Sequence, residues 1–165
     1  MKQTIYELAA NSDKTLLVQR QFDATPEMVW KAWTDSEILA EWWAPTPFKA
    51  ITKSMDFREG GRWHYYMLGP DGSKFWCMVD YLTIDLMKKF TARDFFCDEE
   101  GNKNNELPGM HWENVFTAVD NGTKVSVTVT FNSKEDLDKI VSMGFKEGFA
   151  MAHENLDKVL AEDSK

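Results

Sequence analysis

Glu41-Trp42-Trp43-Ala44-Pro45 places two indole rings side by side just before a proline. The stretch follows a short helical pattern and precedes a long strand-like region. The chain has 7 tryptophans in 165 residues, and aromatic residues make up 13% of it. Aromatic rings are costly to leave in water and bulky to pack. This aromatic load therefore indicates either an unusually aromatic core or a hollow that is lined for an apolar ligand.

The residues before this stretch predict two short helices. Thr25 is a suitable N-cap and Pro26 fits the first helical position. Apolar residues then recur at helical spacing, and a second short helix restarts near Ser36. Pro45 ends it, because proline cannot continue a helix.

The region that follows predicts strand after strand. Turn signals at Gly69-Pro70-Asp71-Gly72 and Asp120-Asn121-Gly122 separate alternating segments. The short connections favour antiparallel pairing. With the segment before the helices, the predicted strands are 15–22, 48–57, 62–68, 74–84, 89–97, 111–119 and 123–131.

One long helix is predicted after the last strand. Ser133 caps it, and an apolar stripe runs to Leu160. Gly144 and Gly148 lie four residues apart on one face, although glycine costs about 1 kcal/mol relative to alanine inside a helix. Either the helix kinks there, or this face approaches a neighbour closely.

These elements predict an α+β fold of one domain. About seven antiparallel strands curve around a long C-terminal helix, and two short helices lie between the first and second strands. The domain is expected over residues 15–163, preceded by an arm over residues 1–14. A curled sheet around a single helix tends to leave a gap between the two.

Composition narrows the choice of partners. The formal net charge is −8 and the sequence pI is about 4.9. An acidic surface repels phosphate backbones and anionic headgroups, so neither nucleic acid nor membrane is an expected partner. The start of the chain lacks the apolar core of a signal peptide, so we expect a cytoplasmic protein. A monomer or a homodimer is expected.

Metal and disulfide chemistry have little support in the sequence. The three histidines, His64, His111 and His153, lack ligand spacing, so neither a metal nor a cofactor is expected. Cys77 and Cys97 form no CxxC pair. The expected hairpin register puts both thiols on one face of the sheet, too far apart for a disulfide.

Several motifs together resemble one family. Their order and spacing are similar to those of AHSA-like proteins, the homologues of the ATPase activator of the ninety-kilodalton heat-shock chaperone, within the START-like helix-grip (SRPBCC) superfamily. The resemblance covers residues 15 to about 162. The motifs are Arg20-x-Phe22, Val29-Trp30-x-Ala32-Trp33-Thr34-Asp35, Trp42-Trp43-Ala44-Pro45, Asp56-x-Arg58-x-Gly60-Gly61-x-Trp63 and Asp71-Gly72.

The resemblance implies a helix-grip fold with a cavity between the sheet and the long helix. Members of the superfamily commonly bind apolar small molecules or lipids. A role in the stress response through a chaperone belongs to larger relatives with an additional domain. Binding of an apolar small molecule or lipid is therefore the leading hypothesis.

Candidate site residues follow from the aromatic and methionine content. For each of them, ordinary core packing or a solvated surface is the simpler reading. The ligand-cavity candidates are Trp30, Trp33, Trp42, Trp43, Trp63, Tyr65, Met67, Trp76, Met78, Trp112, Phe145 and Phe149. The polar cavity candidates are Arg20, Asp56, His64 and Glu113.

Two other functions stay open. A cyclase or hydrolase would need an acid–base group such as His64, Asp56 or Glu113 in the cavity, but no GxSxG nucleophile motif is present. A chaperone-interaction module would need an exposed apolar patch. A non-enzymatic role is favoured over catalysis, and no catalytic residue is assigned.

Overall fold

The computed structural model describes residues 4–8 and 12–163, and it confirms the predicted fold class. Eight antiparallel strands form one sheet in the order β1-β2-β8-β7-β6-β5-β4-β3. The strands are β1 (Ile5–Leu8), β2 (Thr15–Phe22), β3 (Lys49–Met55), β4 (Arg62–Leu68), β5 (Lys74–Asp85), β6 (Lys89–Phe96), β7 (Met110–Val119) and β8 (Gly122–Thr130). The helices are α1 (Pro26–Thr34), α2 (Ser36–Trp42), α3 (Lys134–Ser142) and α4 (Phe145–Asp163).

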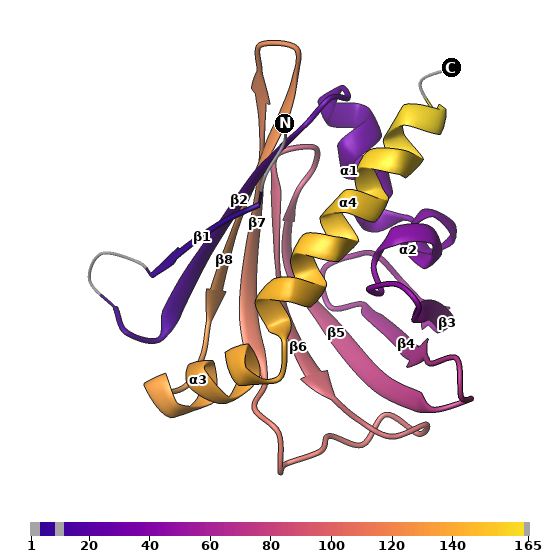
Figure 1. Cartoon of the computed structure of the whole chain (residues 1–165), viewed down its shortest axis with the longest axis vertical. Coiled ribbons are helices and arrows are strands. Elements are labelled where there is room, and N and C mark those ends of the chain that lie inside the picture. The colour runs from indigo at the N-terminus through magenta and orange to yellow at the C-terminus, as the bar shows by residue number, and fades with distance from the viewer. Residues whose placement is uncertain (1–3, 9–11, 164–165) are drawn as a thin grey trace.

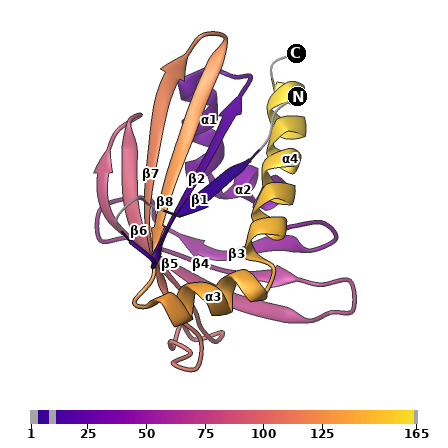
Figure 2. The same ribbon diagram turned by 60° about the vertical axis from the view of Figure 1, so that its left-hand side comes forward.

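All of the helices lie on one side of the sheet. Helix α4 crosses the sheet diagonally, with α1 and α2 beside it (Figure 1). Turned by 60°, the same arrangement shows α4 at the right-hand side of the view, beside the strands (Figure 2). We call the helix-covered side of the sheet its inner face.

The inner face is apolar because the strands alternate. In β2 and β8 every second residue is buried, and Val125, Val127 and Val129 are at most 2% exposed. Successive side chains of a strand point to opposite faces, so this alternation assigns one set to the core.

The eighth strand comes from the predicted N-terminal arm. Residues 5–8 form β1, which pairs with β2 from Ile5↔Gln19 to Leu8↔Leu16. The sequence signal was weak because the strand is short and mostly exposed. The remaining arm residues 1–3 and 9–11 lie outside the described residues.

The cap of the first short helix is as predicted. The Thr25 side chain accepts a hydrogen bond from Met28 N at 3.2 Å, and α1 begins at Pro26. Asp35 caps α2 in the same way through Glu37 N at 2.9 Å. The short connection between α1 and α2 brings Trp33 against Trp42, with ring centroids 5.0 Å apart.

The predicted long C-terminal helix is in fact two helices. Gly144 has a φ of +98°, which falls in the left-handed region that favours glycine and ends α3. Helix α4 then begins at Phe145. Gly148 lies inside α4, where an added Cβ would lie 3.6 Å from Pro45 Cγ. The break explains the first glycine, whereas at Gly148 a Cβ would only reach ordinary van der Waals contact with the segment after α2.

The expected placement of the two thiols was wrong. Cys77 lies opposite Phe96 in the β5–β6 pair, and Cys97 N donates to Trp76 O. The two side chains therefore lie on opposite faces of the sheet, and both thiols are free. No helix among the described residues is long and apolar enough to cross a membrane.

Candidate functional site

A cavity of about 240 Å³ lies between the inner face of the sheet and the α3–α4 segment. Met143 lines it and is 54% exposed, which places one edge of the cavity at solvent beside the α3–α4 junction. We call it the main cavity. Its lining residues are Trp43, Pro45, Tyr65, Met67, Cys77, Asp94, Phe95, Phe96, Met110, Trp112, Ile140, Met143, Gly144, Phe145, Gly148 and Phe149.

The adjacent tryptophans Trp42 and Trp43 have different positions. Trp42 is fully buried and donates through Nε1 to Ala32 O at 2.9 Å, so it holds α2 against α1. Trp43 lines the main cavity, and its Nε1 donates to Tyr65 Oη at 2.8 Å. One ring therefore belongs to the core and the other to the cavity wall.

Aromatic rings form much of that wall. The Trp112 centroid lies 6.0 Å from that of Trp43 and 5.4 Å from that of Phe149. Phe145 lies 5.6 Å from Phe149 along one face of α4. The Trp112–Phe149 pair is edge-to-face and the other two are tilted, and ring pairs at such distances stabilise one another by about 1 kcal/mol beyond area burial. The wall is accordingly preorganised.

Among the described residues, Asp94 is the only carboxylate that lines the main cavity. It lies on β6 between Val79 and Met110, and its Oδ1 atom is buried without a hydrogen-bond partner among the described residues. Burial raises the pKa of Asp94 to about 7, against the smaller opposing effect of the nearby Trp112 indole N–H. The side chain therefore titrates near neutral pH.

Sequence reasoning missed Asp94, although a signal was present. Phe90, Ala92, Asp94 and Phe96 occupy alternate positions of one strand, so the aspartate breaks an apolar run on the inner face. An acidic residue at an inward position is rare unless a partner or a function retains it.

A second, smaller cavity of about 30 Å³ lies beside Asp94. Four of its lining residues carry a buried polar atom without a hydrogen-bond partner in the described chain. They are two donors, Nε1 of Trp33 and of Trp112, and two acceptors, Oδ1 of Asp94 and of Asn114. One water molecule can donate two hydrogen bonds and accept two, so a single water would satisfy all four atoms. The volume of the small cavity admits one water.

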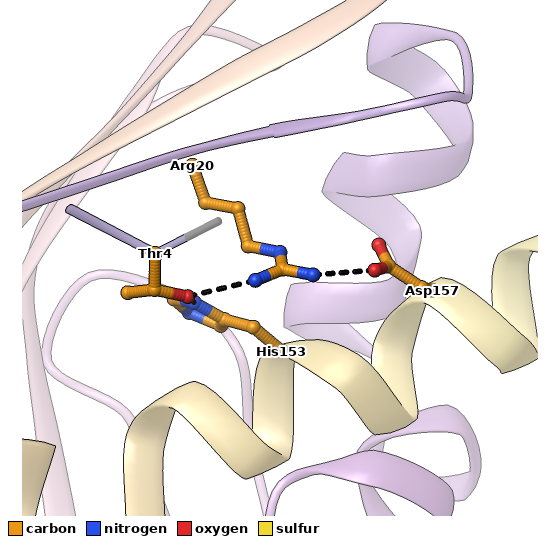
Figure 3. Close-up of polar contacts among 4 residues, drawn as sticks. All are labelled: Thr4, Arg20, His153 and Asp157. Atoms are coloured by element: carbon orange, nitrogen blue, oxygen red, sulfur yellow. Dashed lines mark hydrogen bonds and ion pairs between the residues drawn. The ribbon is translucent and has the colours of Figure 1, made fainter. Parts of the chain in front are cut away.

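Arg20 lies on the inner face but joins a different group of residues (Figure 3). Its guanidinium donates to Asp157 Oδ2 on α4 at 2.5 Å and to Thr4 Oγ1 at 2.9 Å. Thr4 Oγ1 in turn lies 2.8 Å from His153 Nδ1. Burial, followed by the charge of Arg20, lowers the pKa of His153 to about 3, so this imidazole is neutral. The group ties the N-terminal segment, β2 and α4 together.

The main cavity brings together half of the apolar candidates and none of the polar ones. Those that line it are Trp43, Tyr65, Met67, Trp112, Phe145 and Phe149, while Trp33 and Trp63 line the small cavity. Trp30 packs against Phe57, Phe90 and Phe116 in the core, where Trp42 also lies.

Strand alternation points most of the other candidates outward, and Asp56 lies just after the end of β3. Trp76 packs against Tyr66 and His64, and His64 Nε2 lies 3.1 Å from Asp98 O on the outer face. Met78 lies opposite His64 in the register and therefore shares that face. Asp56 forms an exposed ion pair with Arg58, and Glu113 is 42% exposed beside Lys89.

The chemistry that this site can support is limited. Burial raises the pKa of the Cys77 thiol to about 12 and that of Tyr65 well above its usual value, so neither is a nucleophile at neutral pH. Within the part of the chain that the structure describes, no group of three or more His, Cys, Asp or Glu side chains could hold a metal ion. Asp94 is left as the group that could donate or accept a proton.

A sheet that wraps a long helix, with a cavity between them, defines the START-like helix-grip class of proteins. Residues 23–161 match the family described as Activator of Hsp90 ATPase homolog 1-like protein. The chain belongs to this family. No curated protein matches the chain significantly.

Solved structures agree with this assignment. Protein Ms6760 from Mycobacterium smegmatis is 31% identical, with 96% of each chain covered and a TM-score of 0.87. A protein from Arthrobacter aurescens is 32% identical, with 96% of this chain and 91% of that chain covered and a TM-score of 0.88. The AHSA1 protein from Silicibacter pomeroyi, at 16% identity and a TM-score of 0.72, covers 90% of this chain and 99% of its own and shares the fold.

Proposed function

We propose that the protein binds an apolar small molecule or lipid in the main cavity. The observation that carries the proposal is a cavity of about 240 Å³ whose wall is almost entirely apolar and aromatic. Ligand sites are typically concave, largely apolar and furnished with few polar groups. Asp94 and Tyr65 supply those few polar groups here.

The methionines of the wall support the same proposal. Met67, Met110 and Met143 line the cavity from three different elements, β4, β7 and the C-cap of α3. Methionine side chains are flexible and polarisable, so they adapt to apolar ligands of different shape.

The two cysteines offer a matched test, because Cys77 lines the cavity and Cys97 lies on the opposite face. N-phenyl-1-naphthylamine is a neutral apolar probe whose fluorescence rises in apolar sites. Titration of the native protein should give saturable binding. Cys77→Leu should weaken binding at least fivefold by filling the cavity, whereas Cys97→Leu should leave it within twofold.

The proposal fails if the native protein gives no saturable signal. It also fails if both leucine variants bind the probe as the native protein does, because binding would then lie outside the cavity. Circular dichroism of both variants controls for loss of folding.

A chaperone ATPase-activator-like module is the second candidate, and the family assignment favours it. Its test is the ATPase rate of the ninety-kilodalton chaperone with and without the protein. Stimulation that survives Cys77→Leu would support a surface interaction independent of the cavity.

A further inference from the structure

In the part of the chain that the structure describes, the main cavity is lined by an acidic side chain but by no basic one. Among the described lining residues there is no lysine, arginine or histidine, and Asp94 is the only group with a carboxyl. Arg20, a buried cation of the inner face that does not line this cavity, is engaged by Asp157 and Thr4. A ligand carboxylate or phosphate would therefore meet no cation and would face an acidic side chain.

Asp94 lies where a ligand can reach it. It borders both cavities, so its carboxyl stands between the main cavity and the polar atoms of the small one. A buried carboxylate is stable only with a charge or hydrogen-bond partner. The Trp112 indole N–H and the backbone at Asp94 and Met110 act on this carboxyl, but no protein atom among the described residues hydrogen-bonds Oδ1, and the water that the small cavity admits carries no charge. A cationic ligand group would supply the missing opposite charge.

The aromatic wall favours the same kind of group. Trp43 and Trp112 lie within 6.0 Å of one another, and Phe149 packs against both. The faces of tryptophan rings attract ammonium groups, most strongly where water is excluded. Aromatic faces around a single acid are a suitable setting for an organic cation.

From this arrangement we infer that the main cavity selects apolar amines, with the ammonium group bound by Asp94 and the apolar body held by the aromatic and methionine wall. The inference rests on the proposed function, since it names the class of ligand for the same cavity. It predicts discrimination against fatty acids and other apolar anions.

Three probes of nearly equal shape test it: 4-phenylbutylamine, 4-phenylbutanol and 4-phenylbutyrate. Their affinities are measured at pH 8 by calorimetry and by displacement of N-phenyl-1-naphthylamine. The amine should bind at least tenfold more tightly than the alcohol, and the acid most weakly. An amine that binds no better than the alcohol or the acid overturns the inference, but the proposed function stands as long as these compounds bind. If none of the compounds binds, both the inference and the proposed function are overturned.

Asp94→Asn keeps the size of the side chain and removes its charge. It should weaken amine binding at least tenfold and change alcohol binding less than twofold. Asp80→Asn, in a surface ion pair with Arg62 on the neighbouring strand, is the control and should change neither. Unchanged amine affinity in Asp94→Asn would contradict the inference.

The pH profile of the native protein covers the case in which Asp94→Asn does not fold. The titratable groups that face Asp94 are Tyr65 on β4 and Cys77 and Tyr81 on β5, all of which keep their protons below pH 9, and no titratable side chain of α3 or α4 lines the cavity. Amine affinity should fall about tenfold per pH unit below the pKa of Asp94, and alcohol affinity should stay constant. Amine affinity that is flat from pH 8 to pH 5 would overturn the inference.

Discussion

Asp94 shows at the scale of one residue how a buried, inward-facing carboxyl lowers stability. Its pKa is near 4 in an unfolded chain and about 7 in the folded protein, because burial disfavours the charged form. The folded protein therefore binds the proton more tightly. The stability from this proton is complete below about pH 4 and is lost as pH rises toward 7.

Removing the charge should remove this dependence. Between pH 5 and pH 7 the native protein should lose roughly 2 kcal/mol of unfolding free energy relative to Asp94→Asn, since each unit of pKa difference corresponds to about 1.4 kcal/mol. Urea unfolding of both proteins at the two pH values measures the difference. Parallel pH dependences would show that Asp94 is not desolvated in the folded state.

The sequence predicted some site residues and not others for a physical reason. Trp43 and Phe149 follow from the aromatic content, because large rings must be buried somewhere. Strand register decides which face a residue occupies, and a shift of one position reverses every side chain. Trp76 was expected in the cavity but lies on the outer face, and Asp94 was missed. Short alternating patterns specify register weakly, because register is a tertiary property.

At the scale of elements, the junction of α3 and α4 positions one wall of the cavity. Gly144 and Gly148 both line the cavity, but only Gly144 has a positive φ. Composition alone did not distinguish the two glycines, because both fit a helical pattern. The backbone conformation distinguishes them.

Alanine substitutions should have opposite effects at these two positions. Gly144→Ala should destabilise by about 1–2 kcal/mol, because a Cβ strains the left-handed conformation. Gly148→Ala should stabilise by up to about 1 kcal/mol, since its Cβ would make an ordinary contact with Pro45. Thermal or urea unfolding measures both. Equal effects would argue for one continuous helix.

The link between β2 and α4 gives a second prediction at this scale. The Arg20 side chain is 3% exposed and that of Asp157 35%, so Arg20→Met would leave Asp157 and Thr4 without their partner. We expect a loss of about 2 kcal/mol in unfolding free energy. Arg62→Met breaks an exposed pair with Asp80 and should cost less than about 1 kcal/mol, which makes it the matched control.

A similar loss in both variants would contradict the structural role of the Arg20 group. The sequence placed Arg20 correctly beside Phe22 on one strand face, but not its partners. Asp157 and Thr4 lie far from it in the chain, and no local pattern connects them.

At the scale of the molecule, the fold was predictable to a large degree. Turn signals, strand alternation and helix caps each act locally, and they agreed with one another over most of the chain. The short edge strand β1 was missed, and the break at Gly144 was left as one of two alternatives, because each depends on contacts with distant segments. Whether a curled sheet and one helix enclose space also depends on the packing of all side chains together.

The central claim is that the main cavity is where an apolar ligand binds. Methyl-labelled methionine NMR during titration with 4-phenylbutylamine tests it most directly, because Met67, Met110 and Met143 line the cavity while Met78 faces outward and Met151 lies outside it. We predict large, saturable shifts of the three cavity methyl groups, with Met78 and Met151 unchanged. Shifts confined to Met78 or Met151, or no saturable shift at the cavity methionines, would contradict the account.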